Sequence, residues 1–98
     1  MMSQLAKLQE QIAQAQEEIA NETVTETSCG GAVSVTMTGD QHCKAIKIDP
    51  DLLTEGDAEM LEDILLAAVN KALESSRKLS EEKMAPFTNM LSGFGMGR

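Results

Sequence analysis

The sequence predicts an α+β fold with the element order α-β-β-β-α, in which an antiparallel three-stranded meander lies between two long helices of a dimerising protomer. Three features predict it: a helical apolar period over residues 3–22, a glycine pair followed by apolar–polar alternation over residues 30–38, and a second helical period after Asp49-Pro50. A chain of 98 residues buries only roughly 65% of its unfolded surface, so its core is too small to cover two long helices. We therefore expect a second copy to cover part of them.

Residues 3–22 predict the first helix. Apolar side chains recur at alternating steps of three and four, at Leu5, Leu8, Ile12, Ala15 and Ile19. Good helix formers, mainly Gln and Glu, separate them. Such a heptad stripe packs on the chain's own sheet or on another helix, from this chain or from a partner. Both kinds of packing can occur in one helix, along different parts of it.

A hairpin is predicted to follow the first helix. The segment Thr23 to Cys29 is rich in Thr and favours a strand, and Gly30-Gly31 is typical of a two-residue hairpin turn. The segment Ala32 to Thr38 alternates strictly between apolar and hydroxyl side chains, which gives the sheet one dry face. The apolar positions of this strand are Val33, Val35 and Met37.

The third strand is predicted between two turns. Residues 39–42 form the first turn, and Cys43 to Asp49 is the strand, with Ile46 and Ile48 on one side. Pro50 ends the strand, because proline has no N–H to donate to a β-ladder and restricts the residue before it.

The second long helix is predicted to begin at Asp57, a plausible N-cap, after a loop or single turn over Asp51 to Gly56. It continues to about Ala85, where Pro86 is expected to stop it. A helix of this length, about 42 Å at 1.5 Å per residue, exceeds the width of so small a domain. Its C-terminal half must therefore project or pack on a partner.

One domain is expected over residues 1–86. Residues 87–98 contain three glycines and no apolar period, and are predicted to be a flexible tail. The chain has no Trp or Tyr, and both of its Phe residues lie in this last segment. The core must therefore be built from aliphatic side chains, each worth roughly 1.5–3 kcal/mol when buried.

Charge and hydropathy restrict the location and the partners. Sixteen acidic residues oppose eight basic ones, and a net charge of −8 disfavours nonspecific binding to polyanions. No apolar run approaches the roughly 20 residues that span a bilayer, and residues 1–20 lack a signal peptide's basic start and apolar centre. We expect a cytoplasmic protein without membrane contact, in which Cys29 and Cys43 are reduced and half-buried.

No catalytic or cofactor site is predicted. The one histidine, His42, precedes Cys43, and adjacent strand residues point to opposite faces, which does not suit a Cys–His nucleophile pair. The acidic run from Asp49 onward does not match a calcium loop, because Leu53 stands at a ligand position and Thr54 where glycine is required. We expect a protein that is not an enzyme and that holds no metal or cofactor.

Aromatic and basic side chains indicate which kind of nucleic acid the chain could contact. Stacking on single strands needs aromatic side chains, which the body of the chain lacks, whereas contact with duplex phosphates needs only Lys and Arg. Acidic residues three or four positions away on the same helix partly offset these charges. The candidate contacts are Lys7 on the first helix and Lys71, Arg77, Lys78 and Lys83 on the second.

A set of motifs runs through the middle of the chain. In order they are Gly30-Gly31, Val33, Val35, Met37 and Gly39; Cys43-Lys44, Ile46, Ile48-Asp49-Pro50 and Leu52-Leu53; Met60-Leu61-Glu62-Asp63, Ala67-Ala68, Asn70 and Ala72; and Glu82-Lys83-Met84. This pattern resembles the YbaB/EbfC family of small bacterial nucleoid-associated proteins, over about residues 4–86.

The resemblance implies an α-β-β-β-α protomer, a tweezers-shaped homodimer with protruding helices, and binding to double-stranded DNA with little or no sequence preference. The motif residues are structural, so the resemblance assigns no site residue. The chain has fewer basic residues than many members, with only Lys7 near its start and Ala45 after Lys44. The main hypothesis is a nucleoid-associated DNA-binding homodimer; the alternative is an adaptor that holds a protein partner with the same helices.

Overall fold

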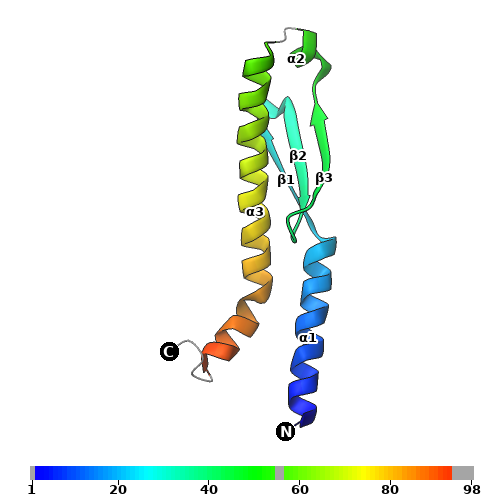
Figure 1. Ribbon diagram of the computed structural model, residues 1–98, viewed down its shortest axis with the longest axis vertical. Helices are drawn as coiled ribbons and strands as arrows, with labels where there is room; N and C mark the ends of the chain where they lie inside the picture. The colour runs from blue at the N-terminus through cyan, green and yellow to red at the C-terminus, as the bar shows by residue number, and fades with distance from the viewer. Residues whose placement is uncertain (1, 55–56, 94–98) are drawn as a thin grey trace.

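The computed structural model describes residues 2–54 and 57–93, and the predicted α+β fold is confirmed (Figure 1). A three-stranded meander lies between two long helices, with a short helix before the second. The elements are α1 (Met2–Asn21), β1 (Thr23–Ser28), the turn η1 (Cys29–Gly31), β2 (Val33–Thr38), β3 (Cys43–Ile48), α2 (Pro50–Thr54) and α3 (Ala58–Gly93).

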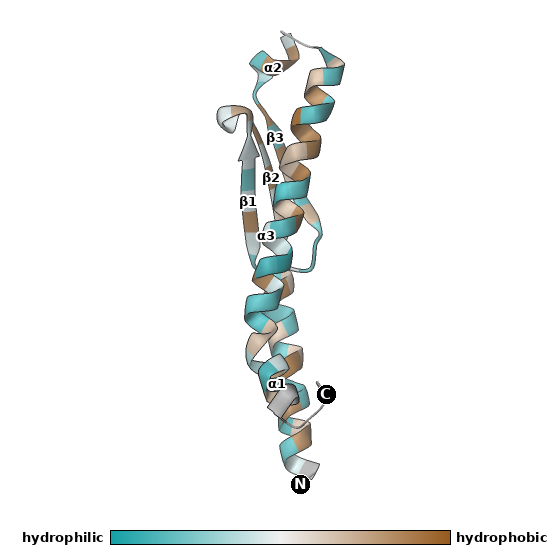
Figure 2. Cartoon of the chain, turned by 90° about the vertical axis from the view of Figure 1, so that its left-hand side faces the viewer, coloured by the Kyte–Doolittle hydropathy of each residue, from teal (hydrophilic) through white to brown (hydrophobic). Residues whose placement is uncertain are grey.

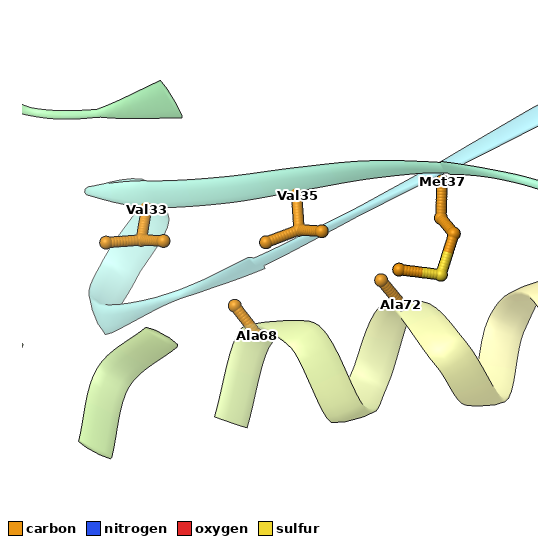
Figure 3. Close-up of a cluster of buried hydrophobic side chains, with 5 residues drawn as sticks. All are labelled: Val33, Val35, Met37, Ala68 and Ala72. Carbon is orange, nitrogen blue, oxygen red and sulfur yellow. The ribbon is translucent and has the colours of Figure 1, made fainter. Parts of the chain in front are cut away.

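The sheet has the order β1-β2-β3, and both strand pairs are antiparallel. The predicted alternation in β2 is confirmed, because Val33, Val35 and Met37 are at most 2% exposed. Figure 3 shows these three side chains pointing toward Ala68 and Ala72 of α3, which are fully buried. Two alanines let α3 approach the sheet closely, so a thin aliphatic core suffices without any aromatic side chain.

The turn between β1 and β2 is longer than predicted. Ser28 pairs with Val33, so four residues connect the strands, and the prediction of a two-residue turn was wrong. Cys29, Gly30 and Gly31 all have positive φ, at 56°, 67° and 94°. A left-handed run of this kind favours glycine, and the two glycines supply two of its three positions.

Helix α3 begins as predicted but ends later. The Asp57 carboxylate accepts a hydrogen bond of 3.1 Å from the backbone N–H of Glu59, which confirms the N-cap. The helix continues to Gly93 with Pro86 inside it, so the predicted end near Ala85 was wrong. A proline removes one backbone hydrogen bond and clashes with the preceding turn, which kinks a helix without necessarily ending it.

Figure 1 shows α3 changing direction in its last turns, the part that contains Pro86. The predicted flexible tail therefore begins inside a helix, and its residues 94–98 lie outside the described residues. A domain boundary at residue 86 stays a prediction.

The molecule is long and thin, with extents of 64 × 26 × 17 Å. Its radius of gyration is 18.6 Å, against about 13 Å for a compact chain of this length. Most of α1 and the C-terminal part of α3 extend beyond the sheet in the same direction (Figure 1). We call these two projecting segments the legs. The heptad stripe of α1 is fully buried only at its sheet end, where Ile19 is 4% exposed. Leu8, Ile12 and Ala15 are half-buried, and Leu5 is 55% exposed.

The legs are joined to the sheet by the turn between β2 and β3. The backbone N–H of Gly39 donates to the carbonyl oxygens of Ile19 and Glu22, each at 3.0 Å. On the other side, the buried hydroxyl of Ser76 in α3 donates to the carbonyl of Thr38 at 2.6 Å. We call this contact between α1, the turn and α3 the joint; it fixes the directions in which the two legs leave the sheet.

Candidate nucleic-acid interface

The five predicted phosphate contacts lie on the two long helices and do not form one cluster. Lys7 is exposed on the leg of α1, and the other four are spread along α3. From Lys71 to Lys83 the helix advances about 18 Å. Lys71 and Lys78 are seven residues apart and share one face of α3, whereas Arg77 and Lys83 point to other faces.

Lys71 reaches from α3 to the edge of the sheet. Its ammonium donates a 2.8 Å hydrogen bond to the backbone carbonyl of Thr27 in β1. The side chain is still exposed, and an ammonium group has three N–H donors, so two remain for another acceptor. Lys71 therefore stays available to a phosphate while its position is held by the sheet.

Arg77 and Lys83 are engaged by carboxylates. Arg77 lies 3.4 Å from Glu74 on the same helix, with both side chains about 60% exposed, and such pairs are weak. Lys83 makes a 2.9 Å ion pair with Glu22, directly after α1, and so links the two legs close to the joint. These carboxylates lower the positive potential that α3 can offer to a polyanion.

The hydrogen bond to Glu22, and then the charge of that carboxylate, raise the pKa of Lys83. A raised pKa means that the pair stabilises the folded state below the ordinary lysine pKa of 10.5 and that this contribution is lost as pH rises through the folded-state value. Lys83 is therefore charged and paired at neutral pH. This ion pair could not be predicted from sequence patterns, because Glu22 and Lys83 are far apart in the chain.

The turn between β2 and β3 is structural, as predicted. The hydroxyl of Thr38 donates to Asp40, and His42 lies 3.2 Å from the same carboxylate. These contacts, the Thr38 hydrogen bond first, lower the pKa of Asp40. His42 and Asp40 thus close the turn that forms the joint.

The two cysteines are free and exposed, so the expectation that they are half-buried was wrong. Ser28, the residue before Cys29, pairs with Val33 of β2, and Cys43 pairs with Met37 of the same strand. Four residues of β2 separate these positions, about 13 Å along the strand, which is beyond the reach of a disulfide.

Across residues 2–54 and 57–93, no three His, Cys, Asp or Glu side chains come together as metal ligands. None of the helices in those ranges combines the length and apolar character needed to cross a bilayer.

The geometry is that of a small elongated binding protein, with a three-stranded sheet, two helical legs and dispersed cations. The YbaB/EbfC DNA-binding family model matches residues 1–91, and the chain belongs to that family. The predicted resemblance is thereby confirmed.

Relatives and solved structures agree with this membership. A nucleoid-associated protein of Chloroflexus aurantiacus is 39% identical over 93 residues, which cover 95% of this chain and 93% of the relative. A nucleoid-associated protein of Pelotomaculum thermopropionicum is 41% identical over 91 residues, covering 93% and 87%. The crystal structure of an uncharacterized protein from Helicobacter pylori matches with a TM-score of 0.72 and 27% identity, over 91% of this chain and 90% of that one.

Proposed function

We propose that this protein is a nucleoid-associated protein of the bacterial cytoplasm that binds duplex DNA as a homodimer with little sequence preference and has no enzymatic activity. The family match over residues 1–91 carries the proposal. It is supported by relatives named as nucleoid-associated proteins at about 40% identity over most of their length.

The arrangement of the cations supports binding without sequence preference. Phosphate contacts position a protein on DNA but carry no sequence information, whereas base reading needs a compact set of side chains in a groove. The candidate contacts Lys7, Lys71 and Lys78 are exposed and spread over two helices. Spread cations of this kind suit a backbone that presents the same charge along its whole length.

The homodimer is supported by apolar surface that one protomer leaves uncovered. Helix α3 packs on β1 and β2, and Ile46 on β3 remains 48% exposed although it pairs with the buried Val35. On α3, Lys71 and Ser75 make hydrogen bonds to β1, at Thr27 and Glu26. The opposite flank of the helix therefore faces the β3 side of the molecule.

That opposite flank is apolar. Leu66 is 61% exposed there, and Val69 and Leu73, three and seven residues later, are only partly buried. In Figure 2 the hydrophobic residues of α3 gather in the half beside the sheet. We call the surface formed by Ile46, Ile48, Leu66, Val69 and Leu73 the apolar strip. Next to it, the outer edge of β3 offers unpaired backbone groups that a second copy can also cover.

DNA binding by the legs is tested with the double variant Arg77→Glu/Lys78→Glu. The parent is expected to bind a labelled duplex, with log K falling against log salt by about 0.9 per phosphate contact. Reversing two charges on each protomer is expected to abolish the binding, because it replaces attraction by repulsion at four positions of the dimer. Fluorescence anisotropy at two salt concentrations, with helicity checked by circular dichroism, measures both.

A parent protein that leaves the duplex unbound even at about 50 mM salt, where phosphate contacts are strongest, would replace this proposal with the adaptor alternative. The exposed apolar residues on the legs, Leu5 and Met90, are what an adaptor would use. If the double variant binds as tightly as the parent, the contacts on α3 are wrongly assigned.

A second prediction concerns the Glu22–Lys83 ion pair, whose removal is expected to tighten DNA binding. Glu22→Gln removes one carboxylate and releases the Lys83 ammonium from its 2.9 Å ion pair. DNA affinity is expected to rise, with a salt slope steeper by about 0.9 for each released lysine that reaches a phosphate. The effect on stability is expected to be small, because the pair is exposed to solvent. The Glu17→Gln variant, an equal charge change at an exposed position of α1, is the control; an equal gain in both variants would mean that only net charge matters.

A further inference from the structure

The face of the sheet that points away from α3 is lined by hydroxyl groups. Val33, Val35 and Met37 face α3, so the residues between them face outward, since side chains alternate along a strand. The pairing register extends this outward row across all three strands, to Thr23, Thr25, Thr27, Ser34, Thr36 and Lys47. We call this surface the hydroxyl face.

The hydroxyl face is an exception to the acidic character of the chain. The protein has sixteen acidic and eight basic residues, yet none of the outward positions of the sheet is acidic. Lys47 stands opposite Ser34, and Lys44 is exposed at the irregularity in the β2–β3 pairing. Among the described residues these two lysines form no ion pair, whereas Arg77 and Lys83 do.

Lys71 places a third cation at the opposite border of the hydroxyl face. Its ammonium is bonded to the carbonyl of Thr27 in β1, and Lys47 lies on β3, about 10 Å across the sheet. Lys78 continues the Lys71 side of α3 toward the legs. The hydroxyl face thus has positive charge at both edges of the sheet, from Lys47 on β3 and from Lys71, which reaches the edge of β1.

The hydroxyls supply hydrogen-bond donors between these charges. Thr25 and Thr36 lie directly opposite, with their oxygens 3.0 Å apart, and this pair uses one of its two hydroxyl protons. The other proton is free for an external acceptor. Threonine and serine hydroxyls commonly donate to DNA phosphate oxygens, and small side chains let the phosphate backbone come close to the sheet.

We propose that the hydroxyl face, with Lys47 on it, Lys71 at its β1 border and Lys44 exposed at the irregularity of β3, is a second surface that contacts the phosphate backbone of duplex DNA. This rests on the proposed DNA-binding function and extends it from the legs to the sheet. The apolar strip lies on the other face of the sheet, so dimerisation leaves the hydroxyl face accessible.

The double variant Lys44→Gln/Lys47→Gln tests the charged part. Two lysines on each of two protomers give four contacts, so the slope of log K against log salt is expected to flatten by about 3.6. The variant Lys44→Arg/Lys47→Arg restores the positive charges and is expected to restore the slope. The variant Thr25→Val/Thr27→Val tests the hydroxyls at unchanged net charge, and is expected to weaken binding with the slope unaltered.

The measurements use full-length protein, a labelled duplex and fluorescence anisotropy over a range of salt, with circular dichroism and sedimentation to establish fold and assembly. If the parent binds and the Gln variant keeps its affinity and slope, the sheet makes no contact and the inference fails, while the proposed function stands. If the parent binds no DNA, both fail. Equal binding by the Val variant and the parent would overturn the role of the hydroxyls, whose threonines would then serve only strand formation.

Discussion

The variant Ile46→Glu/Leu66→Glu is expected to sediment as a monomer of 10.5 kDa at concentrations where the parent is a dimer. Both residues lie in the apolar strip, at 48% and 61% exposure in a single protomer. Sedimentation equilibrium at low micromolar concentration measures the change. Circular dichroism is expected to show unchanged secondary structure, because exposed side chains of one protomer are replaced.

The size of the effect follows from burial. Covering an aliphatic side chain stabilises by about 1.5–3 kcal/mol, and a two-fold axis makes each of the two positions count twice. About half of each side chain is already covered within one protomer, so their loss costs roughly 3–6 kcal/mol of association free energy, and each 1.4 kcal/mol is a factor of ten in Kd. Four carboxylates placed in an apolar interface add a desolvation cost. Dissociation is then expected at the low micromolar concentration of the measurement.

The matched control places the same charges on the hydroxyl face. Thr25→Glu/Thr27→Glu adds two carboxylates to the sheet on the side away from the apolar strip, and the dimer is expected to persist. A dimeric Ile46→Glu/Leu66→Glu variant would show that the protomers meet elsewhere. A monomeric parent with full helicity would contradict the homodimer itself.

The elements that could be predicted from the sequence are those specified by local patterns. The alternation of Val33, Val35 and Met37 fixes one face of β2 without knowledge of what covers it. The Asp57 cap is equally local, because the carboxylate bonds to a backbone N–H two residues away. The fold class follows from these patterns, since their order leaves few ways to cover one dry sheet face.

The features that could not be predicted depend on residues distant in sequence. Lys83 is a plausible phosphate contact on a helical wheel, and only the packing of α1 beside α3 brings Glu22 to within 2.9 Å of it. The continuation of α3 past Pro86 likewise depends on whether the turns on either side of the proline stay helical. The proline alone does not determine this. The hydroxyl face was visible as a polar alternation, but the strand register was needed to place Lys47 on it.

Gly39 is expected to be the most sensitive single position for the stability of the protomer. A Cβ atom built at Gly39 would lie 2.5 Å from the carbonyl oxygen of Ile19 and 2.7 Å from that residue's Cγ2. The nearest of these atoms is backbone, so it cannot move aside as a flexible side-chain end could. Any side chain at this position therefore pushes α1 away from the joint.

The variant Gly39→Ala is expected to lower the free energy of unfolding by about 2–4 kcal/mol. Overpacking a filled site costs roughly 1–3 kcal/mol. Displacement of α1 also breaks the hydrogen bond that the single Gly39 N–H shares between Ile19 and Glu22, which adds about 1 kcal/mol. For a domain of this size, each kcal/mol shifts Tm by about 4–8 °C. Urea and thermal unfolding followed by circular dichroism measure both quantities.

The control is Gly30→Asn in the turn between β1 and β2. A Cβ at Gly30 meets nothing within 4 Å, and asparagine tolerates the positive φ of 67° at that position. This variant is expected to lose less than about 1 kcal/mol, so the comparison separates the steric contact at the joint from the general effect of removing a glycine. A Gly39→Ala protein as stable as the Gly30→Asn protein would show that α1 is not anchored at the joint, and the directions of the legs would then have to be set by the Glu22–Lys83 pair and the Ser76 hydrogen bond instead.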